Sequence, residues 1–347
     1  MSCSISRTVH PPFTLQIYDR LTISEIAMLN FFRFLDSDYF PSGVTAVLSK
    51  KTECNLSRTL PFVVLHLSCL SVFLTGWSPF ALYLAISLYF IRMFFVTGFY
   101  HRYFSHKTYK TSRVAQAIFA VLGTTAVQRG PLWWAAHHRV HHKLADKEGD
   151  VHSPVRSGFL WSHIGWITSD CYMPTDYSKV GDLVRYPELH LINRFDWFFP
   201  ILMGIAVYCL GEFVGKSHPD WHTNGWQCVS WGIVSTVVLF HATAAINSLA
   251  HTVGSQPYSL EDNSRNNFFL ALVTMGEGWH NNHHKYPTLV RQGLEWWQID
   301  LTFYLLAALA KLGVIWDLRC TPQSHTETAV FESQPGTREI TVANSAK

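Results

Sequence analysis

The chain has 347 residues, of which 48% are hydrophobic and only 15% are charged, and its formal net charge at pH 7 is +3. A composition so poor in charged residues is typical of a membrane protein rather than of a soluble domain. The small net charge and the scattered lysines and arginines argue against a nucleic-acid partner. The seven cysteines form no CxxC pair, which argues against a disulfide framework or a thiolate metal site.

Residues 1–59 are mixed and polar, without the charged-then-apolar pattern of a cleaved signal peptide. Four apolar runs follow, each near the roughly 17–25 residues that a helix needs to cross a hydrocarbon core. The runs are 60–76, 79–100, 195–214 and 225–247. Short connections within each pair predict two transmembrane hairpins, so both chain ends should lie on one side of the membrane.

The same parity places 101–194 and 248–318 on the side of the N-terminal segment. That segment is rich in lysine and arginine, whereas the opposite loops contain only Lys216, and the positive-inside rule therefore assigns the shared side to the cytosol. The sequence predicts an all-α integral membrane protein with four transmembrane helices and a cytosolic helical cap over them. Two shorter apolar stretches, 112–128 and 159–168, predict cap helices at the membrane surface. The polar C-terminal residues 319–347 predict a disordered tail.

Nine histidines gather on the cap side of the spans. They form one HxxxxH motif, two HxxHH motifs and a histidine at the end of the fourth span: His101, His106, His138, His141, His142, His251, His280, His283 and His284. Positions three and four apart share one face of a helix, so each HxxHH motif can grip metal. Nine imidazoles exceed what one ion can take.

The spacing within these motifs suggests how the ligands divide. Residues five apart on a regular α-helix diverge by roughly 140°, so His101 and His106 are expected to serve two ions unless the helix ends between them. Adjacent histidines, such as His141 and His142, point about 100° apart and can be divided between neighbouring ions.

Imidazole ligands suit several transition metals, whereas structural zinc usually recruits thiolates and calcium or magnesium prefers oxygen. Iron and zinc both remain open on this argument. Neutral ligands leave the positive charge of the metals uncompensated, so nearby carboxylates should orient the imidazoles from outside. The candidates are Asp146, Glu148, Asp150 and Glu277, although the first three also fit a solvated acidic turn.

The motifs HRYFSH, HRVHH, NSLAH and GEGWHNNHHKYP, on a four-span background, resemble the membrane-bound fatty acyl desaturases, specifically the acyl-CoA Δ9 (stearoyl-CoA) desaturases. The resemblance covers roughly residues 60–318. It implies two iron ions (Fe²⁺) held by the nine histidines, and an asparagine, matching Asn247, that reaches one iron through water. It also implies that dioxygen and two electrons are used to remove hydrogens from adjacent methylenes, leaving a cis double bond. The tail lacks an HPGG haem-binding motif, so a separate electron donor of the cytochrome b5 or ferredoxin type is expected.

The resemblance also implies a narrow apolar tunnel that bends beside the metal. Its kink residues match Gln128, Trp134 and Thr243. Met93 lies eight residues before His101, about 12 Å along a helix, and Tyr89 lies one turn further, so these two are expected to close the tunnel and limit chain length.

Two positions depart from the pattern of acyl-CoA users. His137 stands where an acidic residue is frequent, and Ala244 stands where a tryptophan is frequent. Acyl-CoA is the expected substrate, but a chain on a carrier protein or on a lipid stays open. The expected location is the endoplasmic reticulum membrane, or the inner membrane of a bacterium.

Two other functions fit clustered histidines. One is a related di-iron hydroxylase or oxygenase, because the same oxidant could place oxygen on the chain. The other is a zinc-binding transporter or sensor, which should carry its histidines along a path inside the spans.

Of the remaining histidines, His241 is expected to line the tunnel or pack between helices, and the others are expected to be surface or satisfied core residues: His10, His66, His152, His163, His190, His218, His222 and His325.

Overall fold

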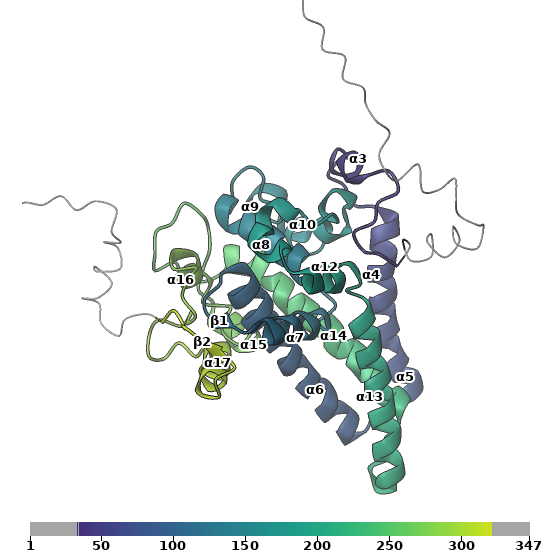
Figure 1. The fold of residues 1–347 in the computed structure, drawn as a ribbon. Coiled ribbons are helices and arrows are strands. Elements are labelled where there is room, and N and C mark those ends of the chain that lie inside the picture. The colour runs from purple at the N-terminus through teal and green to yellow at the C-terminus, as the bar shows by residue number, and fades with distance from the viewer. Residues whose placement is uncertain (1–32, 34, 321–347) are drawn as a thin grey trace, which may run out of the picture.

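The computed structural model describes residues 33 and 35–320 (Figure 1). Most of segment 1–59 and nearly all of the tail 319–347 therefore lie outside the described residues, as do His10 and His325. Within the described part the fold is helical, and its only sheet is a pair of two-residue antiparallel strands, β1 (Lys110–Thr111) and β2 (Ile315–Trp316).

Four helices are long and apolar enough to cross a membrane, as the sequence predicts: Leu56–Thr75, Pro79–Ser105, Phe198–Ser217 and Gly225–His251. The first span consists of α4 (Leu56–Ser68), η1 (Cys69–Ser71) and α5 (Val72–Thr75), and the second of α6 (Pro79–Phe94) and η2 (Phe95–Ser105). The third span is α13 (Phe198–Ser217), and the fourth consists of α14 (Gly225–Ser248) and η7 (Leu249–His251). Three of them begin at a side-chain N-cap, because Asn55, Ser78 and Asn224 each accept a backbone N–H of the first turn.

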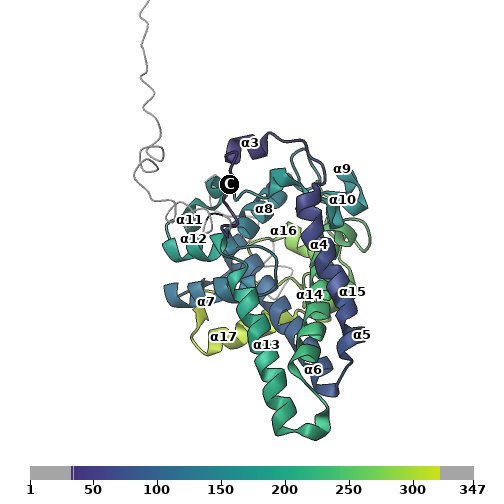
Figure 2. The same cartoon turned by 90° about the vertical axis from the view of Figure 1, so that its right-hand side faces the viewer.

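The spans taper toward one end of the molecule, while the short helices gather at the other end (Figures 1 and 2). α14 is central, since it packs against α6, α13 and α4. Arg92 of α6 is buried and donates to Thr236 Oγ1 at 2.6 Å and to Ser235 Oγ at 2.8 Å, both on α14. This arginine therefore faces protein, and its polar contacts join the second span to the fourth.

The short helices form a cap at the histidine end of the spans. They are α3 (Val44–Leu48), α7 (Arg113–Thr124), α8 (Pro131–Leu144), α9 (Pro154–Ser157), α10 (Phe159–His163), η3 (Gly165–Thr168), η4 (Asp170–Tyr172), η5 (Tyr177–Val180), α11 (Gly181–Val184), α12 (Pro187–Arg194), α15 (Phe268–Val273), α16 (His280–Lys285) and α17 (Leu301–Lys311), whereas η6 (Pro219–Trp221) connects α13 to α14. The predicted cap helix 112–128 corresponds to α7, which is shorter than expected, and the predicted 159–168 corresponds to α10 with η3, which together cover the same range.

The core of the cap fixes the helix that carries HRVHH. Phe99 of η2 stacks on Phe119 of α7 with ring centroids 3.9 Å apart, and Leu132 of α8 is fully buried in the same cluster. The start of α8 is held by Asn193, whose side-chain oxygen accepts the N–H groups of Leu132 and Trp133. A Cβ at Gly130 would lie 2.5 Å from the Cα of Asn193, so the close approach requires glycine.

Candidate metal centre

The end of the second span is a π-helix, η2, and this changes how its two histidines lie. The N–H of His106 donates to the carbonyl oxygen of His101 at 3.2 Å, a bond between residues five apart. In a π-helix such residues stack above each other, whereas in an α-helix they diverge. The expectation that His101 and His106 serve different ions is therefore wrong: their ring centroids lie 4.8 Å apart, in one cluster.

The nine histidines meet in two groups. The first group holds five imidazoles whose ligand nitrogens all lie within 4.8 Å of one another: His101, His106, His138, His142 and His283. Three pairs of Nε2 atoms are nearly in contact, at 3.0 Å for His101 and His283, 2.8 Å for His106 and His138, and 2.9 Å for His142 and His283.

The second group holds the other four histidines: His141, His251, His280 and His284. The Nε2 atoms of His251 and His280 lie 3.0 Å apart. The two groups adjoin, since the ring centroids of His142 and His284 are 4.5 Å apart. Adjacent histidines are divided between the groups, as their helical spacing predicts.

Four carboxylates hold the outer nitrogens of these rings. The Nδ1–carboxylate distances are 2.5 Å for His101 and Glu277, 3.1 Å for His141 and Asp150, 2.9 Å for His251 and Asp146, and 3.0 Å for His284 and Asp262. Three of the four predicted carboxylates are thus in contact with a histidine. Glu148 is exposed and makes no contact with the nine rings among the described residues, while Asp262 was not predicted. The acidic pair in "SLEDN", between the third and last histidine motifs, could have indicated it.

This arrangement fixes the ring tautomers. A carboxylate accepts from Nδ1–H, so the Nε2 of each ring that it holds is left as a lone pair directed into its group. Burial, reinforced by the neighbouring imidazoles, holds the pKa of six of the rings well below its ordinary value: His106, His138, His142, His280, His283 and His284. Neutral rings whose lone pairs converge repel one another unless a cation lies between them. The donor set therefore fits bound metal ions.

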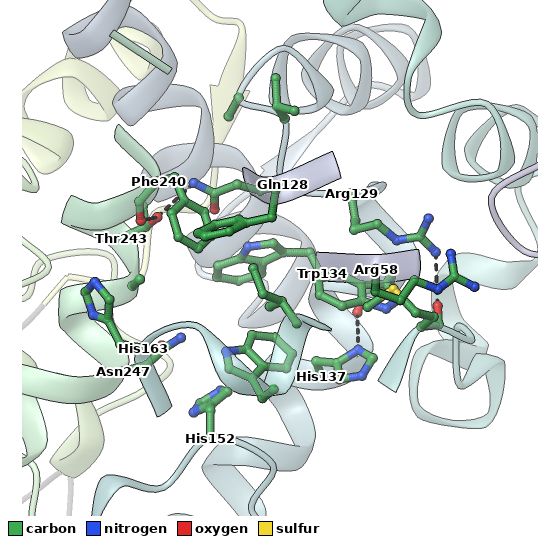
Figure 3. Close-up of a pocket in the computed structure, with 18 of the residues that line it drawn as sticks. Arg58, Gln128, Arg129, Trp134, His137, His152, His163, Phe240, Thr243 and Asn247 are labelled. Atoms are coloured by element: carbon green, nitrogen blue, oxygen red, sulfur yellow. Dashed lines mark hydrogen bonds between the residues drawn. The ribbon is translucent and has the colours of Figure 1, made fainter. Parts of the chain in front are cut away.

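Two cavities adjoin the groups. The larger, of about 360 Å³, lies between α4, α14 and the cap (Figure 3), and the smaller, of about 50 Å³, reaches histidines of both groups. The volume of the larger is within the usual range of ligand sites. Trp134, His138, Thr243 and Asn247 line both cavities, which places Asn247 where the larger cavity meets the histidine groups.

The predicted tunnel residues divide between these spaces. Gln128, Trp134 and Thr243 line the larger cavity, and the amide of Gln128 donates to Thr243 Oγ1 at 2.8 Å (Figure 3). Met93 is fully buried and lines the smaller cavity. Tyr89 lines neither, because its hydroxyl donates to the carbonyl oxygen of Val273 at 2.7 Å.

Three histidines outside the predicted ligand set also line the larger cavity: His137, His152 and His163. His137 lies with its Nδ1 3.0 Å from the carbonyl oxygen of Trp133, and burial lowers its pKa to about 4. His152 is a core residue, as one of its two expected places, but not a satisfied one: its Nδ1 lies 3.7 Å from Asp150 Oδ1 and has no hydrogen-bond partner among the described residues. It packs on His141, with ring centroids 4.4 Å apart. Its position eleven residues after His141, in the same turn as Asp150, could have indicated that it lies beside the histidine groups.

His163 also belongs to a hydrogen-bonded chain of three histidines. His66 Nε2 lies 3.0 Å from His241 Nε2, and His241 Nδ1 lies 3.0 Å from His163 Nε2. His163 Nδ1 then meets Ser248 Oγ at 2.8 Å. The chain joins α4, α14 and α10, so His241 packs between helices, one of its two expected roles.

Four membrane-length helices, with adjoining histidine groups at one end and an apolar cavity beside them, define a helical membrane protein with a candidate metal site. The sequence model of the family named "Fatty acid desaturase" matches residues 75–318, and the chain belongs to this family. It is 36% identical over 314 residues to an acyl-CoA 5-desaturase, AL21, of Anemone leveillei, with 86% of this chain and 93% of the relative covered.

Other relatives act on different substrates. A palmitoyl-monogalactosyldiacylglycerol delta-7 desaturase of Arabidopsis thaliana is 33% identical over 275 residues, covering 77% of this chain and 69% of the relative. An sn-1 stearoyl-lipid 9-desaturase of Anabaena variabilis is 33% identical over 276 residues, covering 78% and 96%. The family makes the chain an oxidoreductase of acyl chains at a lipid bilayer, while the names of its relatives differ in carrier and in double-bond position.

Proposed function

We propose that this chain is an O₂-dependent di-iron desaturase that introduces a cis double bond, at Δ9, into a saturated acyl chain for the synthesis of unsaturated fatty acids. The observation that carries the proposal is the convergence of nine imidazoles in two adjoining groups that open onto an acyl-sized cavity. Family membership supports the reaction class. The Δ9 position comes from the resemblance of the histidine motifs.

Iron would be held by the five-histidine group and the four-histidine group, with Asn247 beside them. Bound iron would supply the reduction of dioxygen and the oxidising power to take hydrogens from unactivated methylenes, which zinc cannot supply because it has no redox chemistry. The protein's own residues have other tasks. Glu277, Asp150, Asp146 and Asp262 keep the Nδ1–H groups in place, so that the lone pairs stay directed inward.

The cavity walls position the chain and exclude water. Trp134 and Phe240 provide apolar surface to the larger cavity. The hydrogen bond from Gln128 to Thr243 ties the loop before α8 to α14 near the junction of the two cavities, so it fixes where the chain must bend. Holding one pair of methylenes against the metal groups is the step that selects the double-bond position.

The carrier, donor and membrane are proposals from the sequence. The resemblance points to acyl-CoA, to an external donor of the cytochrome b5 or ferredoxin type, and to the endoplasmic reticulum membrane with the site facing the cytosol. The hydroxylase alternative uses the same site and differs only in the product. The transporter alternative is not supported, since the chain belongs to an enzyme family.

The test uses cells that lack their own desaturase and depend on added unsaturated fatty acid, because such cells offer the chain on every carrier. Expression should restore growth and yield monounsaturated chains with the bond at Δ9, as located by mass spectrometry of derivatised fatty acids. His142→Ala should do neither. Hydroxylated chains in place of alkenes would favour the hydroxylase, and no change in the fatty acids despite membrane-inserted protein would refute the proposal.

A further inference from the structure

The larger cavity extends between two of the membrane-length helices. α4 contributes Pro61, Phe62 and Leu65 to its lining, and α14 contributes residues from Thr236 to Asn247. Eleven residues of helix span about 16 Å, so the cavity runs along the fourth span for half of a bilayer core. A ligand in it can thus extend to the level of the membrane interior.

The wall between this cavity and the bilayer is one helix thick. The opposite side of α4 is apolar and exposed at Leu60, Val64 and Leu67, with 56%, 52% and 59% of their surface accessible. Phe62 meets Phe240 of α14 edge to face, with ring centroids 5.2 Å apart, on the side toward the cavity. An acyl chain in the bilayer is therefore separated from the cavity only by α4 and by the contact between Phe62 and Phe240, which closes the seam between α4 and α14.

The cations of the cavity are already paired. Arg58 Nε lies 2.9 Å from Asp170 Oδ1, and Lys50 Nζ lies 2.6 Å from the other oxygen of the same carboxylate. Arg129 lies 3.5 Å from Asp38 and 3.4 Å from Asp196. A nucleotide carrier presents phosphates, which are bound by arginine and lysine groups that are free to turn toward them.

Freeing the second guanidinium would be costly. Asp38 and Asp196 are both nearly buried, and removing the partner of a buried carboxylate leaves an uncompensated charge. Arg129 also donates to the carbonyl oxygens of Ser37 and Met173, so it ties the cap together. The two terminal nitrogens of Arg129, the residue next to Gln128, are thus committed to structure. Only its buried Nε–H has no partner among the described residues, so the pair of N–H groups that binds a phosphate bidentately is not free.

The remaining polar groups suit an uncharged ligand. A carbonyl oxygen can only accept, so the Nδ1 of His137 carries its proton and the other nitrogen is an acceptor. The amides of Gln128 and Asn247 are neutral donors and acceptors (Figure 3). Such groups bind hydroxyl and ester groups without demanding charge.

From this geometry we propose that the acyl chain is presented as part of an uncharged membrane glycerolipid and reaches the cavity from the bilayer between α4 and α14. The inference rests on the proposed desaturase function and names its carrier. This carrier, a glycerolipid, differs from the acyl-CoA that the resemblance of the histidine motifs suggests. The lipid would keep its head group at the Arg58 end of the cavity, while its chain passes Gln128 and Thr243 toward the metal groups.

The experiment compares carriers with one labelled chain. Purified protein, loaded with iron and supplied with an electron donor, is placed in nanodiscs with deuterated stearate on monogalactosyldiacylglycerol, on phosphatidylglycerol or on coenzyme A. No acyltransferase is present, so the label stays on its carrier and intact-lipid mass spectrometry reports each conversion. The uncharged lipid should be desaturated at least tenfold faster than the other two. Faster conversion of either anionic carrier, or no conversion of the galactolipid by protein that is active in cells, would overturn the inference.

A pair of variants on one helix tests the path. Leu65 lines the cavity, whereas Leu67, two residues along α4, faces outward. Leu65→Trp should slow desaturation of the galactolipid at least tenfold, and Leu67→Trp should change it less than twofold, with the iron content of both equal to the parent. A Leu65→Trp protein that keeps the parent rate would exclude this path. Failure of the desaturase proposal is distinguishable, because the cell assay would then show no alkene from any carrier.

Discussion

The Nδ1 of His101 lies 2.5 Å from Oε2 of Glu277, and both side chains are buried. Glu277 is itself held by Arg102 at 3.2 Å and by the amide of Gln292 at 2.8 Å, and Arg102 also pairs with Asp300 at 2.9 Å. The orientation of one histidine thus depends on a buried network drawn from the second span and from the segments on either side of α16. A fixed ring leaves its Nε2 directed at the other four histidines of its group.

Replacing Glu277 with Gln tests this dependence. The amide keeps the shape but loses the charge that favours Nδ1–H, and such outer partners typically contribute about 10–100-fold to metal affinity or activity. We expect iron affinity to fall within that range, measured by titration of the metal-free protein. Glu148→Gln is the matched control, because this exposed carboxylate touches none of the nine rings, and it should bind iron as the parent does. Parent-like affinity in Glu277→Gln would show that the network only packs.

Removing one ligand from either group should be more severe. His106→Ala in the first group and His284→Ala in the second should each lower desaturation by more than roughly 100-fold, because a missing ligand leaves the metal open or misplaced. His218→Ala, at an exposed site far along the chain, should retain full activity. Turnover of each membrane-inserted variant is measured under dioxygen. An active His284→Ala protein would remove that histidine from the site.

The sequence predicts the four spans and the nine clustered histidines because each signal is local: apolar length for a span, repeated spacing for a motif. The position of the His106 side chain does not follow from the spacing alone. Its ring joins His101 only because the span ends as a π-helix, and the spacing rule assumed a regular α-helix. Asp262 was missed for a different reason, since the contact of its carboxylate with His284 depends on how the intervening loop folds back.

Met93 and Tyr89 were expected to close the tunnel together, and the cavity lining separates them. Met93→Ala should admit longer saturated chains, and Met93→Trp should restrict the enzyme to shorter ones, since the side chain lines the space beyond the kink. Tyr89→Phe should leave the length profile unchanged, because the hydroxyl is engaged with Val273 outside both cavities. Feeding saturated chains of graded length and measuring monounsaturated products decides the matter. An unaltered length profile in both Met93 variants would exclude Met93 as the residue that closes the tunnel.

Asn247 lies where both cavities meet. Asn247→Leu keeps a similar volume but removes the amide, so a water-mediated contact to metal would be lost while the nine imidazoles stay. We expect assembled, iron-containing protein whose turnover is lower by about 10–100-fold. Iron content and turnover are measured on the same preparation. Unchanged turnover would mean that Asn247 only packs against its neighbours.

The most direct test of the central claim is the metal content of active protein. The account predicts two iron ions per chain, loss of desaturation when a chelator removes them, and recovery with Fe²⁺ but not with Zn²⁺. Elemental analysis paired with turnover of the same sample measures all three. Desaturation by iron-free protein, or full activity with a single iron ion per chain, would contradict the account.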